Sequence, residues 1–215
     1  MHARRWMITG MVVLMGLVGC RSAYYNAMEK FGYHKRDILV SRVEQARDAQ
    51  EDTKEQFQSA LERFQSVVRV DGGELESQYK KLNSELQRSE DKAGQVRQHI
   101  ADVEQVAADL FTEWGKELDA YSNASLRRTS EQKLSETQLR YDRLILAMKR
   151  AEAKIEPVLA AFRDQVLFLK HNLNAQAIAA IQHEVRTVEN EIAALIREME
   201  TSITAADAFI QAMGT

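Results

Sequence analysis

The side chain whose position points most directly to chemistry is the thiol of Cys20, the only cysteine in the sequence. It follows an apolar run, residues 6–19, that begins directly after Arg4 and Arg5. Two positive charges, a short apolar core and small residues are the pattern of a secretory signal peptide, and the run is shorter than the ~20 residues of a spanning helix. The sequence therefore predicts export, with residues 1–19 as the signal peptide. The alternative is an ordinary free thiol in a cytosolic protein.

The four residues Leu17-Val18-Gly19-Cys20 resemble the lipobox of bacterial lipoproteins position by position. The resemblance implies cleavage between Gly19 and Cys20 and alkylation of the Cys20 thiol with diacylglycerol. It also implies acylation of the new amino terminus, with palmitate as the expected acyl group. Acyl chains of this kind hold a protein at a membrane surface. With its only thiol lipidated, the mature chain, residues 20–215, can form no disulfide.

The juxtamembrane segment, residues 20–37, combines aromatic and basic side chains. The candidates for contact with a membrane interface are Tyr24, Tyr25, Phe31, Tyr33, Lys35 and Arg36. Aromatic rings favour the headgroup region, and basic side chains favour anionic headgroups. One interpretation is a short interfacial helix that lies along the membrane. The other is an extension of the first bundle helix that caps the end of the bundle.

The remaining polar residues show no catalytic or metal-binding pattern. There is no glycine-rich phosphate loop, and His183-Glu184 is followed by Val185-Arg186-Thr187 rather than by the second histidine of a metalloprotease motif. We therefore expect no catalytic residue, no cofactor and no metal. The formal charge of −3 becomes −5 once Arg4 and Arg5 are removed with the signal peptide. This acidic balance argues against nucleic acid as a partner.

Four segments carry mostly apolar residues at steps that alternate between three and four, and we call these positions the seam. The segments cover residues 39–67, 75–114, 134–169 and 178–213. A repeat of 3.5 residues keeps one seam on one face of a helix, so that helices pack and supercoil along it. Weak points in the pattern lie at residues 71–73, 121–130 and 171–174. The sequence predicts an all-α fold: an elongated antiparallel helical bundle with coiled-coil heptads over residues 38–215.

The number of helices remains open at this stage, because the break at 171–174 contains neither glycine nor proline. Four helices are favoured, and three with a long last helix are the alternative. Thr129 or Ser130 is expected to cap the third helix and Asn174 the fourth. Pro157 removes one backbone donor and should kink the third helix. The turns at 71–73 and 171–174 should lie at the end away from the anchor.

Two hydrophobic features are interpreted as parts of the core. Trp114 falls on the seam side of the second segment, where an aromatic side chain at helical spacing is usually buried. The most apolar run of the mature chain, residues 166–169, is expected to pack inside the bundle.

Stretches along the whole mature chain resemble an uncharacterised bacterial family, domain of unknown function family 2959. They are residues 19–37, 71–75, 121–128 and 164–174. The resemblance implies a coiled-coil-containing lipoprotein of Gram-negative bacteria and carries no activity or functional residues with it. Arg21, rather than aspartate, follows the cysteine, and among such lipoproteins this favours the inner leaflet of the outer membrane, facing the periplasm.

The sequence thus predicts a non-enzymatic envelope lipoprotein with a spacing or scaffolding role. The alternative is an adaptor or oligomeric component of an export or stress-response system. Membrane lipid, through Cys20, and an unidentified envelope protein are the expected partners. A periplasmic hydrolase is a third possibility, which the missing catalytic pattern disfavours.

Overall fold

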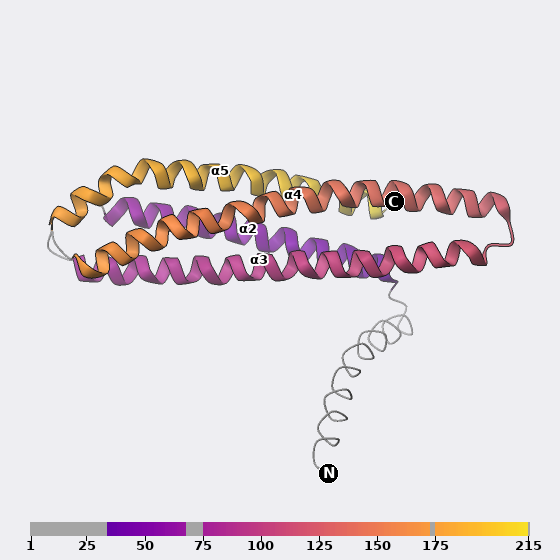
Figure 1. Cartoon of the computed structure of the whole chain (residues 1–215), viewed down its shortest axis with the longest axis horizontal. Helices are drawn as coiled ribbons and strands as arrows, with labels where there is room; N and C mark the ends of the chain where they lie inside the picture. The colour runs from indigo at the N-terminus through magenta and orange to yellow at the C-terminus, as the bar shows by residue number, and fades with distance from the viewer. Residues whose placement is uncertain (1–33, 68–74, 173–174, 215) are drawn as a thin grey trace, which may run out of the picture.

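The computed structural model describes residues 34–67, 75–172 and 175–214, which form four long helices and one short turn of 3₁₀ helix (Figure 1). The elements are α2 (Lys35–Val67), α3 (Leu75–Glu117), η1 (Leu118–Ala120), α4 (Ala124–His171) and α5 (Ala175–Gly214). No strand occurs in these ranges. The predicted all-α bundle is confirmed.

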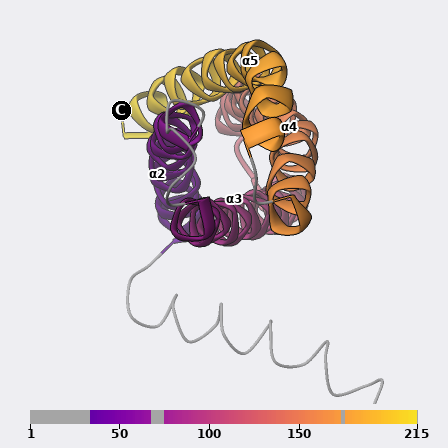
Figure 2. The ribbon, with the colours of Figure 1, turned by 90° about the vertical axis from the view of Figure 1, so that its left-hand side faces the viewer.

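The four helices form a ring in which each contacts its two neighbours. The pairs α2/α3, α3/α4, α4/α5 and α2/α5 are in contact, and the view along the bundle in Figure 2 shows this order. Successive helices run in opposite directions (Figure 1). Helix α4, with 48 residues, is about 72 Å long at 1.5 Å per residue.

The core follows the seams of the four segments. Large side chains that are almost fully buried come from every helix: Leu39, Phe57, Phe64, Leu82, Ile100, Leu144, Met148, Ile155, Ile181 and Leu195. Phe64 of α2 and Phe162 of α4 meet edge to face, with ring centroids 6.1 Å apart. The seam therefore places apolar surface from all four helices in one continuous core, which is the main source of stability.

Among the described residues, ion pairs between neighbouring helices lie on three of the four helix–helix boundaries. Lys92 pairs with Asp52 across α3 and α2 at 2.7 Å. Arg47 pairs with Asp207 across α2 and α5 at 3.0 Å. Residues 90, 97, 104, 149, 156 and 163 form a ladder of such pairs between α3 and α4. These contacts are partly exposed, so each adds little stability, and their main effect is on helix register.

Helices α4 and α5 are separate, so the favoured prediction of four helices is confirmed. Helix α4 ends at His171, and the backbone N–H of Asn172 donates to the carbonyl of Leu169 at 3.2 Å. Pro157 lies within α4 without ending it. The expected cap Asn174 lies outside the described residues. The end of α4 and the start of α5 lie at the same end of the bundle as the end of α2 and the start of α3 (Figure 1).

The predicted start of the third helix is wrong. Helix α4 begins at Ala124, and its N-cap is Asn123, whose side chain accepts hydrogen bonds from the backbone of Ser125 at 2.9 Å and Leu126 at 3.2 Å. Thr129 lies inside the first turns, where its hydroxyl donates to the Ser125 carbonyl. An asparagine that satisfies two free N–H groups is a stronger start signal than the hydroxyls further along.

Candidate functional site

The lipid-anchor residues of the sequence prediction lie outside the described part of the chain. Gly19, Cys20, Tyr24, Tyr25, Phe31 and Tyr33 all precede residue 34. Of the juxtamembrane candidates, the structure places only Lys35 and Arg36, which begin α2. The described residues closest to the predicted anchor are therefore those at the start of α2, and their contacts show how this end of the helix is positioned.

Lys35 and Arg36 connect the start of α2 to two other helices. The Lys35 ammonium forms an ion pair with Glu113 of α3, and its side chain is only 12% exposed. The Arg36 guanidinium donates to the backbone carbonyl of Met213 at the end of α5. Because α5 ends nearby, this carbonyl has no partner within its own helix, and a cation there also suits the helix dipole. For these two residues, the contacts support the capping interpretation over the interfacial one.

The α3–α4 hairpin extends beyond the start of α2 and the end of α5 (Figure 1). It consists of the last turns of α3, η1 and the first turns of α4. Its tip carries exposed Tyr121 and Leu126, 42% and 57% exposed, and an ion pair between Arg127 and Asp119 at 3.1 Å. Because only two helices extend this far, no four-helix core forms in the hairpin, and most of its side chains remain exposed.

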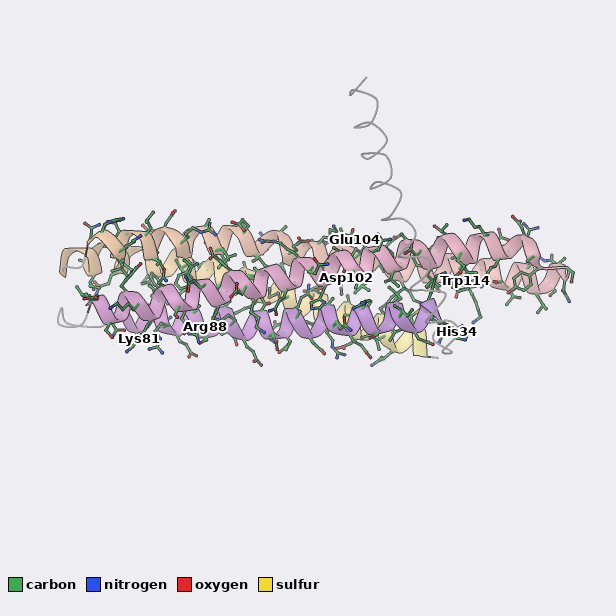
Figure 3. All side chains as sticks on the ribbon, turned by 90° about the horizontal axis from the view of Figure 1, so that it is seen from below. His34, Lys81, Arg88, Asp102, Glu104 and Trp114 are labelled. Carbon is green, nitrogen blue, oxygen red and sulfur yellow. The ribbon has the colours of Figure 1, made fainter. Side chains whose placement is uncertain are left out.

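Trp114 lies in this hairpin and not in the core. Its indole N–H donates to the Ser130 hydroxyl at 2.8 Å, which links α3 to α4 below the tip. Figure 3 shows Trp114 toward the same end of the bundle as His34, with Lys81 toward the other. The prediction of a core position is wrong for Trp114, which is only partly buried, because it lies at the level where α2 begins and α5 ends and the four-helix core stops.

The described residues contain no group of three His, Cys, Asp or Glu side chains that could hold a metal ion. A titratable side chain with a large pKa shift is Tyr141 of α4. Burial against Phe111, with ring centroids 5.4 Å apart, and the nearby charges of Glu104 and Asp142 raise the pKa of Tyr141 to about 12. A phenol held neutral in this way beside an apolar ring is a structural feature of the helix contact.

The apolar run at 166–169 is only half buried, so the expectation of full burial is wrong. Val166 and Leu169 face the core, whereas Leu167 and Phe168 are 53% and 40% exposed. In a helix, four consecutive residues cover all sides, and α4 has one side turned to solvent.

A groove of about 330 Å³ runs between α4 and α5. It is lined by Arg140, Arg143, Leu144, Ala205, Ala208, Phe209 and Ala212.

Comparisons with known proteins bear on the family alone. The model of a family described as a protein of unknown function, DUF2959, matches residues 24–213. The searches of curated proteins and of solved structures give no match. None of the helices in the described ranges contains an apolar stretch long enough to span a membrane.

Proposed function

We propose that this chain, which belongs to the DUF2959 family, is a lipid-anchored envelope protein whose helical bundle acts as a spacer or scaffold. In this proposal Cys20 carries the acyl chains, and the protein occupies the inner leaflet of the outer membrane and faces the periplasm. In this proposal the protein separates or binds other components of the envelope and catalyses no reaction.

The observation that carries the proposal is the way α2 begins. Lys35 lies 15 residues after Cys20, and it is fixed to α3 at one end of the four-helix part of the bundle, at the base of the α3–α4 hairpin. A tether that enters at one end lets the body extend away from the anchor. With α4 about 72 Å long, such a body reaches well beyond the headgroups of the membrane that holds it.

The test is the location of the protein in fractionated cells. The Cys20→Ala variant should leave the membrane fraction, because no acyl chain can be attached. Arg21→Asp serves as the matched control: it keeps the thiol, and it should move the protein from the outer to the inner membrane. A Cys20→Ala protein that stays with the membranes would contradict the anchor.

The alternative role as an adaptor is supported by exposed apolar side chains near the end away from the anchor. Leu167 and Phe168 lie within the last turns of α4, close to the break before α5. Of residues 71–73 and 171–174, where we expect a partner to dock, the structure describes only His171 and Asn172, which lie at this end. Cross-linking in intact cells from Phe168 would capture such a partner, and a matched site at Leu126 on the hairpin should not.

A further inference from the structure

The outer face of α4 carries a second apolar heptad that the bundle does not use. Its positions are seven residues apart: Leu139, Leu146, Ala153, Ala160 and Leu167. All five are exposed, and the three leucines are 56%, 53% and 53% exposed. We call this set the outer stripe. On a helix that packs inward through its seam, the position opposite the seam is normally polar.

The charges beside the outer stripe change sign along the helix. On the side toward α5, Arg143 and Arg150 precede Ala153, and Asp164 follows it. Neither Arg143 nor Asp164 has a hydrogen-bond or ion-pair partner within the described part of the chain. On the side toward α3 the order is Asp142, Lys149, Glu156 and Arg163.

We propose that the outer stripe is the contact surface for a second copy of this chain, with the two α4 helices antiparallel and a two-fold axis beside Ala153. This inference does not depend on the lipid anchor. In an isologous contact the same surface must complement itself. Leu139 lies 14 residues before Ala153 and Leu167 lies 14 after it, so each leucine faces the other from the partner copy.

The same symmetry brings opposite charges together on both sides of the stripe. Arg143 faces Asp164 of the second copy, and Asp142 faces Arg163 at the equivalent level on the other side. Lys149 faces Glu156. Lys149, Glu156 and Arg163 already pair with Glu104, Arg97 and Glu90 of α3, at 2.9, 2.8 and 2.7 Å, so these contacts extend an existing ladder. A parallel arrangement would instead set Lys149 against Arg150 of the second copy, two like charges.

The small residues at the centre allow the helices to approach closely. For an interaxial distance of about 8–10 Å and Cα atoms about 2.3 Å from each axis, the two Ala153 Cα atoms lie about 3.5–5.5 Å apart. The contact from Leu139 to Leu167 is about 42 Å long and about 10 Å wide, on the order of 400 Å² per copy. This is small compared with stable complexes, so we expect weak, concentration-dependent pairing.

The arrangement also has a consequence for the anchored protein. The two starts of α2 lie at opposite ends of the antiparallel pair. Copies that stand upright in one membrane have parallel bundles and cannot pair through this face. With both copies anchored in one membrane, the pairing therefore requires bundles that lie along that membrane.

The experiment is site-directed disulfide trapping in the mature chain, residues 20–215, with Cys20→Ser so that no native thiol competes. This chain keeps every described residue. Ala153→Cys should form a covalent dimer under mild oxidation, because the introduced thiol meets its symmetry mate within disulfide range. The matched control is Ala101→Cys, an exposed alanine on α3, which should remain monomeric at the same concentration.

Two further variants test the direction and the charges. Leu139→Cys alone should not cross-link, whereas a mixture of Leu139→Cys and Leu167→Cys should give the mixed dimer. In the Ala153→Cys background, Arg143→Asp should remove most of the trapped dimer, and adding Asp164→Arg should restore it. These side chains are exposed, so the fold should be unchanged, which circular dichroism would verify.

The proposal is overturned if Ala153→Cys stays monomeric, since the face then belongs to another kind of partner. It is also overturned if Ala101→Cys cross-links equally, or if Leu139→Cys pairs with itself as readily as with Leu167→Cys. Failure of the charge reversal to restore the dimer would contradict the antiparallel register.

Discussion

At the scale of single residues, Gln50 stands out because its amide is fully buried without a partner. Both side-chain polar atoms of Gln50 lack a hydrogen bond among the described residues, and so does the hydroxyl of buried Ser202. The neighbouring seam residue Thr53 differs, because its hydroxyl donates to the Ala49 carbonyl at 2.7 Å. An unsatisfied buried polar group costs about 1–3 kcal/mol relative to a paired one.

We expect Gln50→Met to raise the free energy of unfolding by about 1–3 kcal/mol, because it removes the unpaired amide and keeps the length of the side chain. Denaturant unfolding measures the change. Gln58→Met, on the exposed face of the same helix, is the matched control and should change stability by less than about 0.5 kcal/mol. A loss of stability in Gln50→Met would mean that the amide has a hydrogen-bond partner in solution.

Tyr141 gives a prediction for the dependence of stability on pH. Its pKa is about 12 in the folded protein, against an ordinary value of 10.0. The folded state therefore holds the phenol proton more tightly than the unfolded state does. The stability linked to Tyr141 is fully present below pH 10 and is lost as the pH rises from 10 toward 12.

Tyr141→Phe should abolish this part of the alkaline loss while keeping the ring contact with Phe111. Denaturant unfolding at several pH values measures the loss, and tyrosinate absorbance should lose its most alkaline step. Tyr79→Phe is the control and should leave that step in place. An unchanged alkaline slope in Tyr141→Phe would assign the loss to other groups.

At the scale of helices, α3 contains a glycine that no contact requires. A Cβ added at Gly94 would meet no atom within 4 Å. Gly94→Ala should therefore stabilise the protein by about 0.5–1 kcal/mol, because alanine restricts the unfolded chain and favours the helix. Thermal or denaturant unfolding measures the gain. Gly115→Ala, only two residues before the end of α3, should give less, and a destabilised Gly94→Ala would show that the glycine has a structural purpose.

The seam alone predicts most of the helical structure. Every large buried side chain of the core falls on the alternating pattern or directly beside it. The interruptions of the pattern favour four helices but leave three possible, because the break at 171–174 contains neither glycine nor proline. The hairpin tip could not be predicted in this way. Over residues 117–130 the chain has only one neighbouring helix to bury against, so a seam has no energetic basis there, and the start of α4 depends on the cap at Asn123.

Two further features escape the sequence prediction for different reasons. The contacts of Lys35 with Glu113 and of Arg36 with Met213 join residues far apart in the sequence, and neither residue type nor spacing indicates them. The outer stripe, by contrast, is visible in the sequence as leucines seven residues apart. A heptad count restricted to the inward face does not find the outer stripe. The sequence prediction therefore assigns Leu167 to the core together with its neighbours in the run 166–169.

At the scale of the whole molecule, the four helices form one elongated bundle, and α2 begins at one end of its four-helix part. The start of α2 is fastened to α3 and α5, and the hairpin of α3 and α4 extends past it. The opposite end carries the end of α2, the start of α3, the end of α4 and the start of α5. In the proposed function this polarity separates a membrane-proximal end from a distal one. The outer stripe of α4 runs between them, so contacts along the bundle and contacts at its ends can be made independently.

The central claim is that Cys20 is the lipidated amino terminus of the mature protein. The most direct test is mass spectrometry of the full chain, produced in a Gram-negative host and extracted from its membranes. We predict the mass of residues 20–215 plus a diacylglycerol and one acyl chain, all located on the peptide that begins with Cys20. A chain that retains residues 1–19, or a peptide with an unmodified Cys20 thiol, would contradict the account.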